Sequence, residues 1–283
     1  MTDIRLGYVG LGNMGTPMAR RLVGWPGGLV VYDVRAEATA SFVDAGTEIA
    51  GDLARVANAD VISVTVLDDA QVREVVADLA RHAAPGTVIA VHSTVSGTTA
   101  AALADRFAPS GIHVIDAPVS GGAGAAEKGE LATMVGAPRE VYERVKPVFR
   151  QWAALVIHAG GPGAGTRMKL ARNMLSFTAF AAACEAMNLA EAAGLDLQAL
   201  GRVVRHTDAL TGGPGAIMVR DNMHELEPGH WLHDTFTHTR TLGEKDLSLA
   251  LELGEAVGVD LPLASIALRN LAAGLGVPHR MGE

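Results

Sequence analysis

Residues 4–15 read IRLGYVGLGNMG, an apolar run that leads into three glycines spaced as Gly10-x-Gly12-x-x-Gly15. The next residues, TPMARRLV (16–23), have the composition of an amphipathic helix. Between a strand and a helix, Gly10 can make the tight turn, Gly12 lets the backbone approach a pyrophosphate, and Gly15 permits close helix–strand packing. Helix-terminal N–H groups would face the anion. The predicted dinucleotide-binding turn comprises Gly10, Leu11, Gly12, Asn13, Met14 and Gly15.

A carboxylate stands at the end of the next apolar run, eighteen positions beyond Gly15. Asp33 can accept hydrogen bonds from the adenosine ribose hydroxyls and would repel a 2′-phosphate, which favours NAD over NADP. Arg35 lies close by and would offer a 2′-phosphate a partner, which argues the other way. A solvated carboxylate in a turn is the structural alternative for Asp33. We expect NAD as the cofactor.

Short β-branched runs alternate with helical stretches through the first half of the chain. This alternation predicts a mainly parallel sheet covered by helices. Asp52 and Pro138 stand where caps or first-turn residues of two such helices belong. The expected strands cover residues 4–9, 29–32, 61–66, 87–91, 112–115 and 131–135.

The pattern changes after Val156, beyond which we find helical periodicity and no convincing β-run. Residues 160–165, GGPGAG, suit neither a strand nor a helix interior and mark the domain boundary. From Thr166 to Ala193 the chain lacks Pro and Gly, and it stops at Gly194, a natural left-handed cap. We therefore expect an α/β Rossmann-type domain over 1–161 and an all-helical domain over 162–283, joined by one long helix.

The bulk properties of the 283 residues exclude several classes of function. A formal net charge of −8 gives no overall attraction to nucleic-acid phosphates or anionic lipid. The amino terminus has no basic region followed by a long apolar run, and later apolar segments are interrupted, so we expect a cytoplasmic protein. The lone Cys184 cannot form an intramolecular disulfide, and its Ala-rich surroundings predict a buried, inert thiol.

Five segments in order resemble the β-hydroxyacid dehydrogenase family, which contains 3-hydroxyisobutyrate and tartronate semialdehyde-type enzymes and is 6-phosphogluconate dehydrogenase-like. They are GYVGLGNMGTPMARRL, HSTVSG, DAPVSGGAGAAEKGELATMVGA, GAGTRMKLARNML and the late Lys245-Asp246-Leu247. The resemblance implies a NAD-dependent dehydrogenase with its active site in a cleft between a Rossmann-type and a helical domain. It also implies roles for particular residues: Ser120, Gly121 and Gly122 hold the substrate carboxylate, Leu67 and Thr94 contact the cofactor, Lys169 is catalytic, and Lys245 closes over cofactor or substrate.

Physical chemistry supports two of these implied roles. The Ser120-Gly121-Gly122 segment can expose backbone N–H groups in a concave turn beside a hydroxyl donor, as a carboxylate requires, although a plain loop has the same composition. Lys169 and Asn173 lie four residues apart, so both side chains leave one face of the expected helix. A lysine can accept the hydroxyl proton in oxidation and return it in reduction, and Asn173 can orient the substrate or the lysine. A surface lysine is the alternative.

Two departures from the family pattern concern the substrate rather than the reaction. Arg172 stands where many relatives have a second asparagine, and His92 precedes Ser93 where relatives commonly have aspartate. An imine or carbonyl reductase on the same scaffold is one alternative function, and a non-catalytic NAD(P)-binding regulatory protein is another.

The late histidines suggest a third alternative, a metal-binding protein, but their spacing suits no single ligand helix, and we expect no metal. The long apolar helix predicts a homodimer or homotetramer acting on a small-molecule hydroxy acid or semialdehyde. The histidines concerned are His224, His230, His233 and His238.

Overall fold

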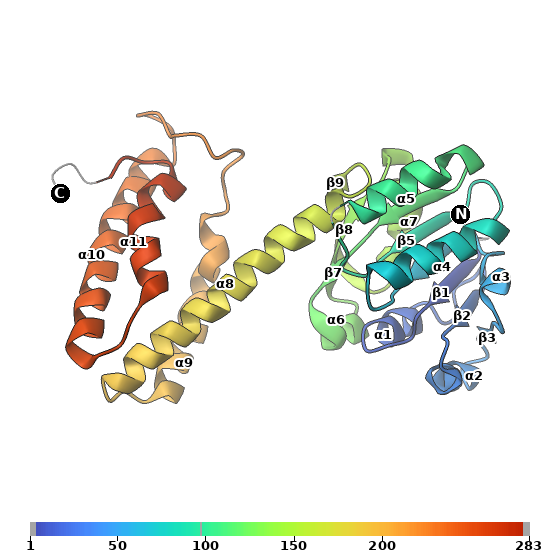
Figure 1. The fold of residues 1–283 in the computed structure, drawn as a ribbon, viewed down its shortest axis with the longest axis horizontal. Coiled ribbons are helices and arrows are strands. Elements are labelled where there is room, and N and C mark those ends of the chain that lie inside the picture. The colour runs from blue at the N-terminus through green and yellow to red at the C-terminus, as the bar shows by residue number, and fades with distance from the viewer. Residues whose placement is uncertain (1–3, 97, 280–283) are drawn as a thin grey trace. The chain divides into compact units, whose positions relative to one another are not determined.

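The computed structural model describes residues 4–96 and 98–279 and divides into two compact units, Met1–Asn173 and Met174–Glu283. The division falls inside helix α8 (Ala164–Ala192), so this one helix contributes to both units (Figure 1). The domain boundary expected at 161/162 stays a prediction. None of the helices in the described part of the chain is long and apolar enough to cross a membrane.

The first unit is built on a nine-stranded sheet with the order β3-β2-β1-β4-β5-β6-β8-β7, to which β9 adds by pairing with β8. Strands β1 to β6 pair in parallel, β8 runs antiparallel to β6 and β7, and β9 is parallel to β8. The strands are β1 (Leu6–Val9), β2 (Leu29–Tyr32), β3 (Glu48–Ile49), β4 (Val61–Val64), β5 (Val88–Val91), β6 (His113–Asp116), β7 (Val119–Ser120), β8 (Leu131–Gly136) and β9 (Ala153–Gly160).

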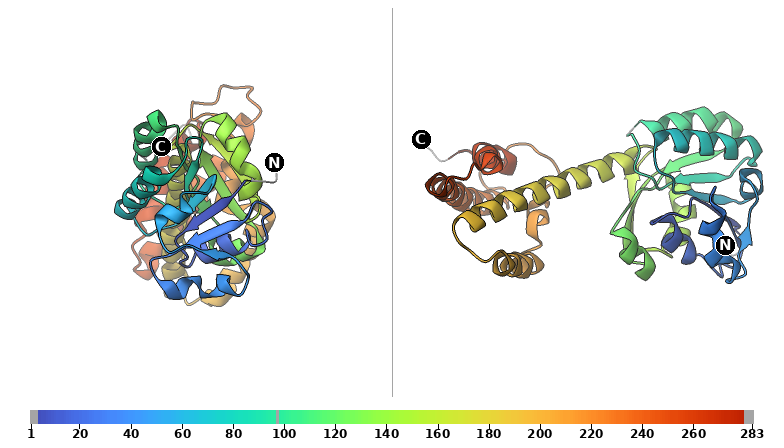
Figure 2. Two further views of the ribbon diagram at one scale, coloured as in Figure 1. Left: turned by 90° about the vertical axis from the view of Figure 1, so that its right-hand side faces the viewer. Right: turned by 60° about the horizontal axis from the view of Figure 1, so that its bottom comes forward.

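Helices cover both faces of this sheet, because alternate strand residues point to opposite sides. One core joins Leu6 and Tyr8 of β1 to α1, α6 and α7, and the other joins Val9 of the same strand to α3, α4 and α5. Figure 2 shows helices on both sides of the sheet. The helices of this unit are α1 (Gly15–Arg20), α2 (Ala40–Val43), α3 (Leu53–Val56), α4 (Asp69–His82), α5 (Thr99–Phe107), α6 (Gly122–Lys128) and α7 (Arg139–Phe149), with short 3₁₀ segments at Ala36–Thr39 and Ala108–Ser110.

The mainly parallel sheet is confirmed, but the expected set of strands omits β9, which continues through Val156 to Gly160. A signal for β9 is present, because residues 153–157 read AALVI, a continuous apolar run, although Leu155 and Ile157 are 53% and 38% exposed in the structure. Strands β3 and β7 are two residues long, too short to show a period.

The second unit contains the rest of α8 with α9 (Leu197–Thr211), a 3₁₀ segment (Gly213–Ile217), α10 (His233–Val257) and α11 (Pro262–Leu275). As expected, Gly194 adopts a left-handed φ of +76° just after α8. The Glu185 carboxylate of α8 accepts hydrogen bonds from the N–H groups of Leu263 (3.0 Å) and Ala264 (2.9 Å), and so caps α11. A small core comprises Leu226, Leu232, Phe236, Leu275 and Val277.

The prediction for Cys184 is wrong, because its side chain is exposed. It lies on α8, where alanines occupy exposed as well as inward positions. An Ala-rich composition therefore cannot tell a buried face of this helix from an exposed one.

His92 follows β5 and is a buried, neutral histidine. It is 3% exposed, with Phe149 and Trp152 packed edge-on against its ring. Its Nδ1 lies 2.7 Å from the Ala117 carbonyl oxygen and its Nε2 lies 3.0 Å from Ser63 Oγ. The neutral ring therefore donates through Nδ1 and accepts the serine hydroxyl hydrogen at Nε2. Burial lowers the pKa of His92 from 6.5 to about 4, against a smaller opposing effect of the bond to Ala117.

This histidine is expected to make the fold sensitive to acid. Above pH 6.5 the His92 ring is neutral in both the folded and the unfolded state. Between pH 6.5 and about pH 4 the ring is protonated in the unfolded chain but stays neutral in the folded protein. Stability should fall by about 3 kcal/mol across this interval from His92 alone, at about 1.4 kcal/mol per pH unit. Urea unfolding across that interval should show a shallower pH dependence in His92→Asn than in the natural chain. Equal slopes would contradict the assignment.

Candidate active site

The strand register brings the ends of five parallel strands to one edge of the sheet. Val9 of β1 is level with Tyr32 of β2 and Val64 of β4, while Val91 of β5 is level with Val64 and with Asp116 of β6. The strand order reverses between β1 and β4, and such a switch point at the carboxyl edge is where ligands bind in open α/β sheets. The expected cofactor and substrate segments follow these strand ends.

A cavity of about 800 Å³ lies at this edge, beside β1, β2 and β4. The glycine turn forms one wall in the way that the motif predicts. A β-carbon on Gly10 (φ +90°) would overlap the Thr65 carbonyl oxygen, and one on Gly15 would overlap the Gly10 carbonyl oxygen, whereas Gly12 has open space before it. The backbone at Gly12 is thus accessible to a pyrophosphate. Of the predicted cofactor residues, the cavity lining includes Gly10, Gly12, Asn13, Asp33 and Leu67.

Asp33 lines this cavity, and its carboxylate is fixed by hydrogen bonds. Its Oδ2 accepts the Leu11 N–H at 2.7 Å, and its Oδ1 accepts the Arg35 N–H at 2.9 Å and faces Arg35 Nε at 3.3 Å. Burial opposes ionisation of Asp33, but the hydrogen bonds from Arg35 and Leu11 and the Arg35 charge together keep its pKa below the usual value. The group is therefore charged at neutral pH, and Arg35 is paired with it.

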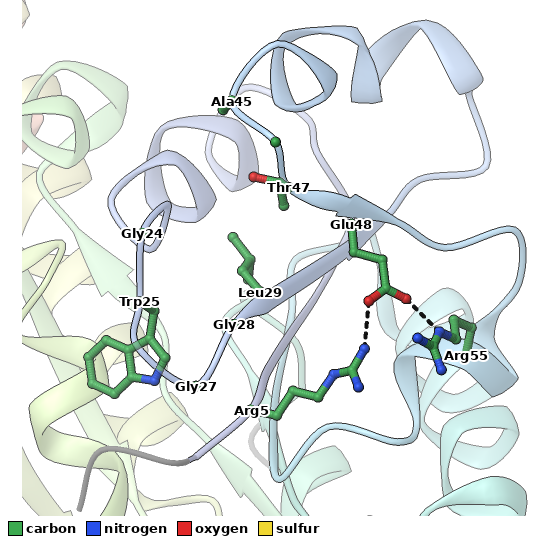
Figure 3. A pocket seen from close by; sticks show the side chains of 11 residues that line it. Arg5, Gly24, Trp25, Gly27, Gly28, Leu29, Ala45, Thr47, Glu48 and Arg55 are labelled. Carbon is green, nitrogen blue, oxygen red and sulfur yellow. Dashed lines mark hydrogen bonds and ion pairs between the residues drawn. The ribbon is translucent and has the colours of Figure 1, made fainter.

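A second hollow, of about 480 Å³, lies beside β2 and β3 and contains two arginines. Figure 3 shows Arg5 and Arg55 approaching the Glu48 carboxylate, with contacts of 2.6 Å and 2.5 Å. One carboxylate thus engages both guanidinium groups, so this hollow is less suited to a pyrophosphate than the cavity beside the glycine turn.

The Ser120-Gly121-Gly122 segment joins β7 to α6 in a backbone conformation that requires glycine. Gly121 and Gly122 have φ values of +135° and +78°, and both are exposed. Thr94 is also exposed, in the loop that follows β5 and His92. Both segments follow strands that end at the carboxyl edge, as a substrate cradle next to a nicotinamide would.

The first turns of α8 belong to the first unit and carry Lys169. Asp116, at the end of β6, is fully buried and accepts the N–H groups of Gly163 and Thr166, each at 2.6 Å. This carboxylate caps α8 from another element, since the GGPGAG segment offers no capping side chain of its own. The amino-terminal end of α8 is thereby held at the carboxyl edge.

Lys169 is only 8% exposed, so the alternative of a solvated surface lysine is wrong. Desolvation, and next the positive charge of Arg172, lower the pKa of the Lys169 amino group below its usual value of 10.5. Arg172 Nη1 also donates to Asn173 Oδ1 at 3.3 Å. Neighbouring positive charge is one of the means by which proteins bring a lysine toward a useful pKa for proton transfer.

Replacing Arg172 with asparagine is expected to raise the pKa of Lys169, because a nearby positive charge disfavours the ammonium form. For the hydroxy-acid oxidation that the family resemblance implies, the pH at which kcat/KM rises should move upward. Arg172→Lys keeps the charge and should leave the profile near that of the natural chain. A profile that stays in place in Arg172→Asn would show that the charge at residue 172 does not tune Lys169.

Met14 of the glycine turn is half-buried in the first unit, whereas Lys245 and the four late histidines lie in the second unit. Lys245 is part of α10, is 59% exposed and pairs with Asp246 at 3.1 Å. His230 stacks on Trp231, and His233 pairs with Asp234. Within residues 4–96 and 98–279, no three His, Cys, Asp or Glu side chains form a group that could hold a metal ion.

Asp116 is a site residue that is not among those predicted from the sequence. A signal for it was present, because this acidic residue directly follows an apolar run and opens the DAPVSGG segment. A buried carboxylate needs hydrogen-bond donors, and a long helix that begins with glycines needs an acceptor. The sequence does not show that these two groups are partners, since they are 47 and 50 residues apart.

Comparison with known proteins gives matches along nearly the whole chain. The model of the NAD binding domain of 6-phosphogluconate dehydrogenase matches residues 5–161, and that of the NAD-binding domain of NADP-dependent 3-hydroxyisobutyrate dehydrogenase matches residues 163–277. A crystal structure of a putative oxidoreductase from Mycobacterium avium is 72% identical with a TM-score of 0.95, covering 98% of this chain and 100% of that one.

Two curated relatives extend this picture. An uncharacterized oxidoreductase of Mycobacterium tuberculosis is 64% identical over 97% of this chain and 94% of its own. The 3-hydroxyisobutyrate dehydrogenase of Pseudomonas aeruginosa is 33% identical over 96% of this chain and 91% of its own. With a dinucleotide-binding unit followed by a helical unit, the chain belongs to the β-hydroxyacid dehydrogenase family of nicotinamide-dependent oxidoreductases.

Proposed function

We propose that the protein oxidises a short β-hydroxy acid, of the 3-hydroxyisobutyrate type, with NAD and with Lys169 as the general base. The observation that carries this proposal is the buried Lys169, whose pKa is lowered by desolvation and by Arg172. A neutral amine at this position can accept the hydroxyl proton, and its ammonium form can return it in the reverse reaction.

The other residues hold the substrate in place. The N–H groups and hydroxyl of Ser120, Gly121 and Gly122 bind the substrate carboxylate, and Asn173 orients the hydroxyl toward Lys169 Nζ. NAD, when bound, supplies the hydride acceptor beside the carbinol carbon. In oxidation the lysine takes the hydroxyl proton, and its positive charge then stabilises the developing carbonyl oxygen.

The choice of NAD over NADP rests on Asp33. Its pKa is low, so it is ionised at neutral pH and would repel a 2′-phosphate. Arg35, which could bind a phosphate, is already paired with Asp33.

A substrate panel tests the function directly. NADH formation would be followed with short β-hydroxy acids, with matched α-hydroxy acids as controls and NADP in parallel. Cyclic imines and NAD(P)H would test the reductase alternative. We expect turnover with one or more β-hydroxy acids and little with α-hydroxy acids, since the cradle and lysine fit a fixed carboxylate–hydroxyl separation. Turnover of imines alone would refute the proposal.

We also propose that the protein forms a homodimer or homotetramer through its second unit. Large apolar side chains follow α8 at intervals of three residues, where Met174, Phe177 and Phe180 are 69%, 64% and 63% exposed. Apolar surface of this kind marks an association site. Others equally exposed in this unit are Leu210, Met218, Met223 and Trp231.

Light scattering at micromolar concentration should therefore give at least twice the chain mass of 29.3 kDa. Phe177→Glu combined with Phe180→Glu should weaken the assembly, because two charges would have to be buried in it. Val43→Glu, at an exposed apolar position of α2, serves as the matched control and should leave the mass unchanged. A monomer in the natural chain would refute the proposal.

A further inference from the structure

We infer that Asp116 is a positioning residue that sets the separation between the carboxylate cradle and the Lys169 amino group. This inference rests on the proposed function, because it concerns the two groups that would hold a β-hydroxy acid at its two ends. Asp116 itself is fully buried and contacts the helix backbone rather than the cavity.

The first step is the contact that holds the amino-terminal end of α8, here called the seat of α8: the Asp116 carboxylate with the N–H groups of Gly163 and Thr166. The two oxygens of Asp116 each accept one backbone N–H, from Gly163 before the first turn and from Thr166 within it. A carboxylate at the positive end of a helix is stabilised by both hydrogen bonds and dipole. Two bonds to separate oxygens fix the direction of the helix end as well as its position.

The second step is the close packing of the first turn of α8 against the backbone of β6 and β8. A β-carbon on Gly136 of β8 would overlap Asp116 Oδ1, and one on Gly165 would overlap the Met134 carbonyl oxygen. The backbone of α8 thus lies directly against β6 and β8, without side chains between them. A seat without flexible side chains leaves the helix little freedom to slide.

The third step connects the seat to the lysine. Thr166 and Lys169 are three residues apart on α8, so their side chains share one face. Thr166 is 0% and Lys169 8% exposed, although Arg167, Met168 and Leu170 are exposed. The face held by Asp116 is therefore the face that buries the amino group.

The fourth step connects the same residues to the cradle. The carbonyl oxygen of Ala117, next to Asp116, accepts the His92 Nδ1 hydrogen at 2.7 Å, and Ser120 follows three residues later. The side chain of one residue thus holds the lysine helix, while the main chain of the next begins the cradle segment. The separation of the two groups is fixed at this point.

Asp116→Asn tests the inference, since it keeps the shape but offers one acceptor oxygen for two N–H donors. We expect kcat with the β-hydroxy acid found by the panel to fall about 10–100-fold, because misplacement by about 1 Å can cost 10²-fold. The NAD dissociation constant and the substrate KM should change less than about 3-fold, because the cavity and the cradle backbone remain. An unchanged kcat would overturn the inference.

A double-mutant cycle separates positioning from general loss of structure. In a Lys169→Ala background, Asp116→Asn should cost little further activity if it acts through the lysine. The same fold loss in both backgrounds would overturn the inference. Glu185→Gln is the matched control, because it weakens a similar long-range cap in the second unit; it should lower Tm with kcat within about 3-fold of the natural value.

Two further measurements keep the test decisive. Amide exchange of residues 161–169 should be faster in Asp116→Asn, and unchanged exchange would overturn the anchor whether or not a substrate is found. If the natural chain is inactive on every substrate tested but amide exchange is faster in Asp116→Asn, the proposed function is refuted. The conclusion that Asp116 holds the amino-terminal end of α8 would still stand. If Asp116→Asn does not fold, Gly163→Ala is the second variant, because alanine is strained at the φ of +87° that Gly163 adopts while the Asp116 carboxylate stays intact. We expect kcat to fall about 3–10-fold, and an unchanged kcat would overturn the inference.

Discussion

Replacing Lys169 with alanine is expected to lower turnover about 10²–10⁴-fold, the range typical of general acid–base catalysis, in both reaction directions. Loss of the ammonium charge beside the developing oxygen would add to this. The NAD dissociation constant should stay close to that of the natural chain, because the glycine turn and Asp33 lie beside β1 and β2 whereas Lys169 lies on α8. Steady-state rates and cofactor titration by fluorescence would measure the two quantities.

Two further lysine variants sharpen this prediction. Lys169→Arg should not restore turnover, because a guanidinium stays protonated and cannot accept the hydroxyl proton at neutral pH. Lys128→Ala removes an exposed lysine of the same unit, at the end of α6, and should leave turnover unchanged. A Lys169→Ala protein with near-natural rates would exclude the proposed mechanism.

Asp33→Ser is expected to weaken NAD binding about 10–100-fold. The ratio of the NADP to the NAD dissociation constant should fall, to below one if the preference reverses. Hydrogen bonds to a charged group contribute about 1.5–3 kcal/mol, and this carboxylate both faces the ribose site and holds the Leu11 N–H of the glycine turn. The substitution also releases Arg35, which could then bind a 2′-phosphate. Dissociation constants for both dinucleotides would measure the effect.

The control for this change removes a charge from the same cavity. Glu74→Gln lowers the negative charge of the lining by the same amount, and Glu74 is exposed on α4. It should leave the NAD/NADP ratio within about 3-fold. A natural chain that already prefers NADP, or a Glu74 effect as large as that of Asp33, would contradict the assignment.

Local signals in the sequence are sufficient to predict the glycine turn and six of the nine strands of the sheet. Each buried parallel strand is a compact run of mostly apolar residues. Gly10 and Gly15 occupy positions where a β-carbon would overlap backbone atoms, so no other residue fits there. Strand β9 carries the same kind of signal in the apolar run AALVI at residues 153–157, but it lies next to the glycine-rich segment 160–165, whose composition suits no strand.

The supports of the site depend on distant pairs, which leave weaker traces. Asp116 bonds to backbone N–H groups, which every residue except proline carries, so nothing in residues 163–166 identifies their partner. In the sequence His92 is only a departure from the family pattern, whereas its hydrogen bonds are made with Ser63 of β4 and with Ala117, which follows β6. Burial of Lys169 likewise follows from packing that periodicity alone does not specify.

The long-range cap of α8 also determines where the polypeptide can be cut. A recombinant fragment ending at Gly160 or Gly161 would lack both N–H donors of the Asp116 carboxylate and the backbone of Gly165, which packs closely against β8. Such a fragment would be poorly soluble or would unfold locally around β6 and β8. The shortest separately expressible nucleotide-binding piece should therefore continue through the first turns of α8, to about Asn173.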